Sequence, residues 1–238
     1  MKTKFFVIVF LSILFLSENL FAQTSSVKTK LELVKSQQKE IQKLTFTKQG
    51  YCFLFDKNGY WQQAIPIAAY NMLQTLNKSG KQIVDIDFSI QNEFLIFFDK
   101  NGFISGNLPE ATKKTLMELK NENVTFNCFS FVQDSGYVVI YNNNGFAYQN
   151  IPALAVDRLR AMNERGSIIK SIAFTAEGGY CILYDKNEYI YESIPPKAIE
   201  MLQELKAKDV TFKDIAFSPN NDFVILFDKN GFGCHFNE

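Results

Sequence analysis

Three aspartates are the residues whose type and spacing could do chemistry. Asp85 and Asp87 stand two positions apart, and Asp214 occupies a position equivalent to Asp85 in a later repeat of the chain. Cleavage of a glycosidic bond uses a pair of carboxyl groups at a set separation, so these side chains are candidates for a hydrolytic centre. The alternative is that they are polar residues that hydrate a narrow channel.

Four further polar residues recur at related positions and could converge with the three aspartates. In a ring of repeats they would line a central channel together with them. The full set of channel candidates for ligand binding is Lys43, Thr45, Asp85, Asp87, Ser130, Ser171 and Asp214.

A second group of candidates is aromatic. Trp61 is the single tryptophan, and Tyr148 and Tyr191 share one column of the repeat with Gln62, Ser105 and Cys234. Exposed rings in this column would suit contact with a sugar or a peptide. The alternative is that they pack under a neighbouring helix.

The motifs of common enzyme and metal sites are missing from the sequence. His235 is the only histidine, and the chain has no Cys-x-x-Cys pair, Gly-x-Ser-x-Gly or Gly-rich phosphate loop. Asp-Lys-Asn-Gly at 56–59 shares letters with a calcium loop, but its Gly follows three residues after Asp56 and the twelfth position is Ile67. We therefore predict no metal, no cofactor and no enzymatic activity.

An internal repeat supplies the elements that must position these residues. The turn asparagines Asn58, Asn101, Asn144, Asn187 and Asn230 follow one another at intervals of 43 residues. Each unit reads as an alternating strand, a continuously apolar strand such as YCFLF, a third strand after the turn, and an amphipathic helix opened by Ile-Pro. The fold class is thus mostly β with helices, in five tandem βββα units.

The recurrent FDKNG stretch reads as the hairpin between the second and third strands. Asp56 suits the first position of a type I turn, and Gly59 suits a left-handed bulge. Glu188 replaces that Gly in the fourth unit, and a side chain in a left-handed position costs about 1 kcal/mol. On this interpretation Glu188→Gly stabilises the protein slightly.

The ends of the chain favour a closed ring. The last unit has no helix of its own, and residues 26–40 supply a helix whose Leu31 matches Leu73 at an offset of 42. The first strands also carry a small or polar column, which would fit a crowded central axis: Thr45, Asp87, Ser130, Ala173 and Ala216. We predict a β-propeller-like ring, with an open βββα solenoid as the alternative.

The stretch IAFSPNNDFVILFDKNGF at 215–232 resembles the AFSPDG-type repeat of Trp-Asp-repeat and TolB-like β-propellers. The resemblance covers the three strands of each unit. It departs from the family in having a helix where those blades carry a fourth strand, and in lacking a Trp-Asp pair. Because such propellers mostly serve as binding platforms, the resemblance implies a binding role. Five-bladed lectins of the tachylectin kind are a weaker likeness.

The N-terminus indicates export. Lys2 and Lys4 precede the apolar run at 5–16, which is shorter than the roughly 20 residues of a spanning helix. We predict a signal peptide over residues 1–22, a single domain over 23–238, a secreted or periplasmic location, and no stable membrane insertion after cleavage.

The cysteine positions indicate core residues, and the net charge limits the classes of partner. Cys52 and Cys181 fall at core positions of the second strands, so we expect small buried hydrophobes, with a Cys52–Cys234 bridge as the alternative. The formal net charge is zero, which gives no electrostatic footprint for nucleic acid. We predict a binding or scaffold protein with a protein or glycan partner. The alternatives are a carbohydrate-binding protein or a glycoside hydrolase that uses the channel carboxylates.

Overall fold

The computed structural model describes residues 26–132 and 136–236. The predicted signal peptide over residues 1–22 lies outside the described residues, so the export of residues 23–238 stays a prediction. In the described part of the chain, no helix combines the length and the apolar character that crossing a bilayer requires.

The chain forms five three-stranded antiparallel sheets, each made of three consecutive strands. The first strands are β1 (Ile41–Phe46), β4 (Ile83–Phe88), β7 (Phe126–Val132), β10 (Ile169–Phe174) and β13 (Phe212–Phe217). The second strands are β2 (Tyr51–Phe55), β5 (Phe94–Phe98), β8 (Gly136–Tyr141), β11 (Tyr180–Tyr184) and β14 (Phe223–Phe227). The third strands are β3 (Gly59–Gln63), β6 (Gly102–Gly106), β9 (Gly145–Gln149), β12 (Glu188–Glu192) and β15 (Gly231–His235).

A helix follows the third strand of each of the first four units: α2 (Ile67–Lys78), α3 (Glu110–Asn121), α4 (Ala153–Arg165) and α5 (Pro196–Ala207). Each begins after the Pro of the Ile-Pro or Leu-Pro pair, whose φ lies near −54°. The N-terminal helix is described over residues 26–36 and ends four residues earlier than the sequence indicates. After the helix the backbone changes direction at Gln38, which has a φ of 56°.

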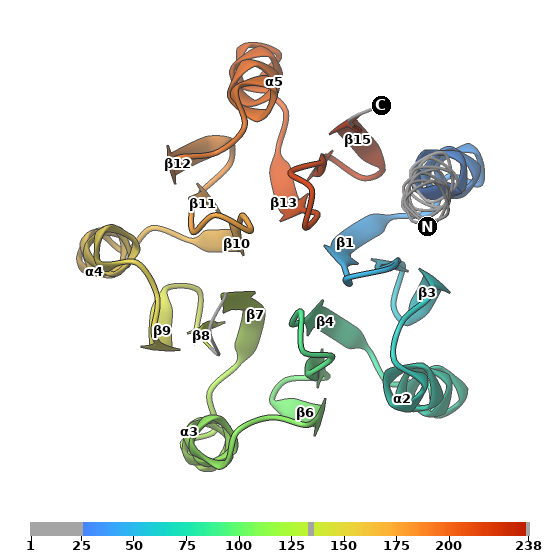
Figure 1. Cartoon of the computed structure of the whole chain (residues 1–238), viewed down its shortest axis with the longest axis vertical. Coiled ribbons are helices and arrows are strands. Elements are labelled where there is room, and N and C mark those ends of the chain that lie inside the picture. The colour runs from blue at the N-terminus through green and yellow to red at the C-terminus, as the bar shows by residue number, and fades with distance from the viewer. Residues whose placement is uncertain (1–25, 133–135, 237–238) are drawn as a thin grey trace, which may run out of the picture.

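The five sheets are arranged about a central axis, with the first strands innermost and the helices at the periphery (Figure 1). Each first strand contacts the first strands of both neighbouring sheets, and β13 of the last unit contacts β1 of the first. This radial arrangement is propeller-like and agrees with the predicted fold class at that level.

The apolar cores lie between neighbouring sheets. One residue of the first-strand column opposite the channel is buried in each of five clusters: Leu44, Ile86, Phe129, Ile172 and Ile215. Leu73 of α2 is fully buried between the first and second sheets, and Leu31 of the N-terminal helix is fully buried between the last and the first. The sequence match between Leu31 and Leu73 is therefore also a structural match.

The DKNG turn makes backbone hydrogen bonds within its own unit and to the next unit. The Asp56 amide donates to the Glu40 carbonyl (2.8 Å) in its own unit, while the Lys57 carbonyl accepts from the Ile83 amide (3.0 Å) at the start of the next unit's first strand. The same inter-unit bond recurs in each unit, and from the last turn it runs from Ile41 N–H to the Lys229 carbonyl (3.0 Å).

The prediction that the Gly of this turn has a left-handed conformation is wrong. Positive φ falls on the first turn residue, for example 52° at Asp56, and neither Gly59 nor Glu188 has it. Gly59 is small for another reason, because a Cβ there would lie 2.2 Å from the Phe55 ring.

Candidate functional site

A belt of five side chains lies at the central axis, one from each first strand. Its members face equivalent positions of the second strands, and each follows a register shift that marks a β-bulge. We call Lys43, Asp85, Cys128, Ser171 and Asp214 the channel belt. The belt is buried, with at most 8% of any member exposed.

Sequence reasoning missed one member of this belt. Cys128 is absent from the predicted channel set, yet it lies 43 residues after Asp85 and 43 before Ser171. That offset was the available signal. Burial raises the pKa of the Cys128 thiol above its ordinary value, so the thiol is neutral at physiological pH.

Lys43 is the cation of the belt and joins three units. Its Nζ lies 3.2 Å from Asp214 Oδ1 of the last unit and 3.4 Å from Asp85 Oδ1 of the second. Ser171 Oγ donates to the same Asp214 oxygen (2.6 Å). Burial alone would lower the pKa of Lys43, but the carboxylates of Asp214 and Asp85 raise it well above its ordinary value, so Lys43 is charged.

The aspartates also accept backbone hydrogen bonds from the following unit. Asp85 Oδ2 accepts from the Phe129 amide (2.6 Å), and Asp214 Oδ2 accepts from the Leu44 amide (2.8 Å). Each carboxylate thus fixes the first strand of its neighbour. These bonds give the two aspartates a structural role that their sequence positions alone did not indicate.

Burial governs the charge of the carboxyl groups. It raises the pKa of Asp85 to about 7, against the opposing effect of Lys43 and with added repulsion from Asp214. Burial likewise raises the pKa of Asp87, opposed by Lys43 and by the hydroxyl of Thr45. The channel therefore holds carboxyl groups that titrate closer to neutrality than ordinary aspartates.

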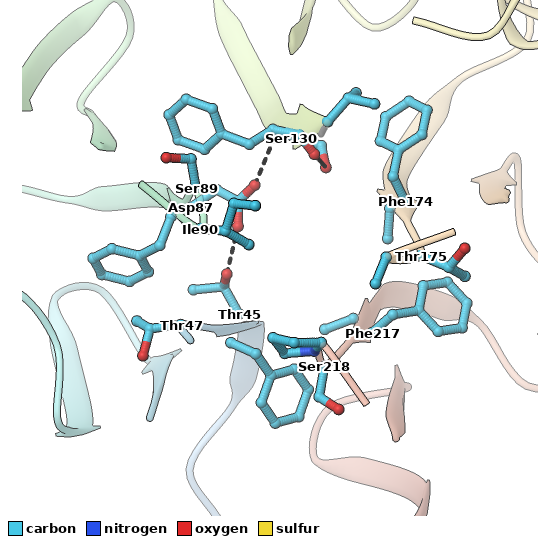
Figure 2. A pocket seen from close by; sticks show the side chains of 18 of the residues that line it. Thr45, Thr47, Asp87, Ser89, Ile90, Ser130, Phe174, Thr175, Phe217 and Ser218 are labelled. Atoms are coloured by element: carbon cyan, nitrogen blue, oxygen red, sulfur yellow. Dashed lines mark hydrogen bonds between the residues drawn. The ribbon is translucent and has the colours of Figure 1, made fainter. Parts of the chain in front are cut away.

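Above the belt, the small column opens into a cavity of about 110 Å³ at one mouth of the channel. Thr45, Asp87 and Ser130 line it, together with the small side chains of Ala173 and Ala216. The Thr45 hydroxyl and the Phe131 amide (2.8 Å) both donate to Asp87, as the dashed lines of Figure 2 show. Asp87 is the carboxylate that borders this cavity.

The rim of the mouth comes from the turns after the first strands and from Val132 at the end of β7. Ile90, Val132, Ala176 and Pro219 form what we call the apolar collar, and Lys48 completes the rim. Ile90 is 49% exposed and lies over Asp87 in Figure 2. Below the collar, Thr47, Ser89, Thr175 and Ser218 form a ring of hydroxyls, whose oxygens accept from turn amides such as that of Gln49 (3.2 Å).

The structure thus brings all seven channel candidates to the central axis, in two layers. Lys43, Asp85, Ser171 and Asp214 form the buried lower layer, and Thr45, Asp87 and Ser130 line the cavity, which Lys43 also borders. Their use in binding a ligand is a separate question.

The aromatic candidates do not gather into one site. Trp61, Tyr148 and Tyr191 lie on β3, β9 and β12, the third strands of three different sheets. Trp61 packs in the cluster that includes the N-terminal helix, with Lys30 Nζ 4.4 Å from the ring centroid. Tyr148 and Tyr191 each stack on an aromatic residue of their own strand. Trp61 and Tyr191 are therefore packed in apolar clusters, whereas Tyr148 is 40% exposed.

The alternative disulfide is wrong, because Cys52 and Cys234 are free and belong to different apolar clusters. The buried positions of Cys52 and Cys181 confirm the interpretation as small core hydrophobes. Across residues 26–132 and 136–236, no three His, Cys, Asp or Glu side chains gather as a metal site would require.

No protein-family model matches the chain, and no curated protein matches its sequence. Among solved structures, it is similar to the β-propeller domain of Cps50 (Swd1) from Myceliophteria thermophila, with 8% identity and a TM-score of 0.35 over 79% of this chain and 67% of that one. It is also similar to YCF48 bound to D1 peptide, with 7% identity and a TM-score of 0.29 over 82% of this chain and 66% of that one.

A third similar structure is a catalytically inactive virginiamycin B lyase from Staphylococcus aureus with quinupristin. The identity is 10% and the TM-score is 0.32, over 82% of this chain and 69% of that one. The propeller-like description of the fold rests on the arrangement of the chain's own five sheets (Figure 1).

Proposed function

We propose that the protein is an exported, non-enzymatic binding protein that holds a partner protein at the mouth of its central channel. One observation carries the proposal: at this mouth, side chains from all five units border one cavity. A ligand seated there contacts every unit at once. The buried side of the channel is filled by the belt, so the mouth is the accessible part of the site.

The position of the carboxylates supports the proposal of a non-enzymatic role. Asp85 and Asp214 are 2% and 1% exposed, and both are bound by backbone amides. A substrate at the mouth would reach Asp87 alone, whereas glycoside cleavage needs two carboxyl groups beside the scissile bond.

We also propose that the ring is closed in solution, with each helix in the place of the fourth strand of a propeller blade. Two contacts between the last and first units support closure. Ile41 N–H donates to the Lys229 carbonyl as in the other units, and Leu31 fills the same kind of position as Leu73.

Closure is tested by a matched pair of core substitutions. If the N-terminal helix is docked as α2 is, Leu31→Ala and Leu73→Ala each lower the free energy of unfolding by about 2–5 kcal/mol, because both leave a cavity in a buried cluster. Urea unfolding followed by circular dichroism measures both. Deletion of residues 24–36 should lower the free energy of unfolding more than either substitution does.

An open solenoid would give the opposite pattern. Leu31→Ala and the deletion would then leave the urea midpoint unchanged, while Leu73→Ala would still lower it.

Binding at the mouth is tested by partner capture. The mature chain, immobilised and exposed to envelope extract or culture medium of the native organism, should retain a protein partner that Ile90→Asp loses. Leu154→Asp is the matched control, since Leu154 is exposed to a similar degree (51%) on α4. A partner retained by Ile90→Asp and lost by Leu154→Asp would place the binding surface on the helices.

A further inference from the structure

The cavity at the mouth has two chemically different levels. The collar of Ile90, Val132, Ala176 and Pro219 is apolar, whereas the floor carries the Asp87 carboxylate. Such a combination suits a ligand group with an apolar stem and a polar head.

The charge of the floor is only partly balanced by the protein, because Lys43 borders the cavity and, against the larger effect of burial, acts to lower the pKa of Asp87 without lying within ion-pair distance of it. Lys43 lies within ion-pair distance of Asp85 and Asp214, and in the described residues no lysine or arginine nitrogen lies that close to Asp87. Asp87 accepts hydrogen bonds from Thr45 on one oxygen and from Phe131 on the other, and the backbone of Phe88 also hydrogen-bonds to the carboxylate. A carboxylate has about four acceptor sites, so about one remains for a donor from the cavity.

The other charges around the mouth do not fill this role. Lys48 stands on the rim with an exposed side chain, where water and salt screen its charge. Above the pKa of Asp85, which is about 7, the three channel aspartates outnumber the single buried lysine, so the field in the cavity favours a cation.

From these observations, and resting on the proposed function, we propose that the mouth is a socket for one cationic side chain, lysine or arginine, of the partner protein. The alkyl stem lies against Ile90 and the rest of the collar. The charged head donates to Asp87, with the Thr45 and Ser130 hydroxyl oxygens as further acceptors. A charge-assisted hydrogen bond of this kind gives selectivity for the head group, because a neutral or anionic group cannot use the carboxylate in the same way.

The socket is tested with four small probes that have unbranched alkyl stems of similar length: n-butylammonium, n-butylguanidinium, n-butanol and n-butyrate. Each is titrated into the isotopically labelled mature protein at pH 8 and constant ionic strength, and amide shifts are followed by NMR. We expect saturable shifts at Thr45, Ser130 and Phe131 with one or both cations, and binding at least about tenfold weaker for butanol and butyrate.

Asp87→Asn is the decisive variant. Its amide oxygen can still accept from the Phe131 amide, so the strand contact is kept while the charge is removed. The cation should bind at least about tenfold more weakly to it. Ile90→Ser is the companion variant. It should weaken the binding of all four probes by a similar factor and leave the preference for the cations unchanged. Circular dichroism and the urea midpoint verify the fold of both variants.

Two outcomes would overturn the socket: butyrate or butanol binding as tightly as the cations, or cation binding unchanged in a folded Asp87→Asn variant. Partner capture separates this result from the proposed function. If a partner is lost with Ile90→Asp but retained by Asp87→Asn, the mouth binds its partner and the cationic socket is wrong. If neither variant affects capture, binding at the mouth is itself wrong.

Discussion

The outer turns and the channel belt both join each unit to the next, but they do so in different ways. The turns use main-chain groups, and the bond from a turn carbonyl to the next first strand measures 2.8–3.0 Å in all five units. The belt uses side chains that differ in every unit except the second and fifth, which both supply an aspartate. The turns repeat, whereas the belt is one set distributed over five repeats.

The turns therefore show how each unit is joined to the next, whereas the belt shows how different units contribute different residues. A turn contact can be understood from one unit, because every unit forms its own copy. Lys43, in contrast, is stable in the channel only because Asp85 and Asp214 come from two other units. A buried charge without its partners is strongly unfavourable, so the belt residues depend on each other in a way that the turns do not.

The largest effect is expected from Lys43→Met, which keeps the length of the side chain and removes the only cation of the belt. Asp85 and Asp214 would then be buried without a counter-charge, and we expect a loss of about 3–5 kcal/mol in the free energy of unfolding at pH 8. Urea unfolding measures it.

Lys213→Met is the matched control. Lys213 also joins the last unit to the first, through Glu40 Oε1 at 2.6 Å, but the two side chains are 20% and 44% exposed. Lys213→Met should lower the free energy of unfolding by about 1 kcal/mol or less, since water screens the ion pair with Glu40. Equal losses in the two variants would show that burial does not set the belt apart.

The second effect is a pH dependence that arises in the channel. Asp85 has a pKa of about 7 in the folded protein, against about 3.9 in an unfolded chain. Between these values the folded state binds more protons than the unfolded state, so stability falls as pH rises from about 4 to about 7 and is then constant. Asp87, whose pKa is also raised, acts in the same direction. Lys43 stays charged throughout this range.

We therefore expect the native chain to lose about 2–3 kcal/mol of stability between pH 5 and pH 8. Urea midpoints at the two pH values measure the change. Asp85→Asn, which has no proton to lose, should reduce the change by more than half. A native midpoint that is flat or that rises over this range would mean that the buried carboxyl groups do not keep their protons.

A smaller effect is expected at the turns, where equivalent residues should behave alike. Asn101 Nδ2 donates to the Lys120 carbonyl at the end of α3 (3.5 Å), and Asn230 Nδ2 donates to the Lys35 carbonyl at the end of the N-terminal helix (3.4 Å). Alanine at either position should cost about 0.5–1.5 kcal/mol, the usual contribution of one hydrogen bond. A thermal or urea unfolding series compares them directly. A cost at Asn101 with none at Asn230 would mean that the N-terminal helix is not held in the same way.

The sequence was sufficient for the parts of the fold that repeat. Five units, their strand order and the position of the Ile-Pro helices follow from columns that agree at a constant offset, and the small column of the first strands correctly indicated the side that faces the axis. Leu31 could be placed because it matches Leu73 in type and spacing.

The belt was less predictable because its chemistry depends on side chains from several units together. Nothing in the letters around Asp85 or Asp214 shows that a lysine from another unit lies between them, or that both accept amides from the next first strand. Cys128 was overlooked because its type differs from that of its equivalents. The left-handed position of the turn was assigned to Gly59 by residue type, whereas Asp56 occupies it because its Oδ1 accepts from the Glu40 amide (2.9 Å).

The smallest effect, at Glu188, tests that corrected turn. Because Glu188 is not left-handed, Glu188→Gly relieves no backbone strain, contrary to what the sequence indicated. The change instead removes the ion pair with Lys206 Nζ (2.5 Å, both side chains 42% exposed) and adds backbone freedom to the start of β12. We expect a loss of about 0.5–1 kcal/mol in the free energy of unfolding. The matched change is Gly59→Ala, where the new Cβ would press on the Phe55 ring, so it should cost more than the change at Glu188. Stabilisation by Glu188→Gly would show that the left-handed residue was correctly placed at the fourth position after all, and that the Asp is not the residue that shapes the turn.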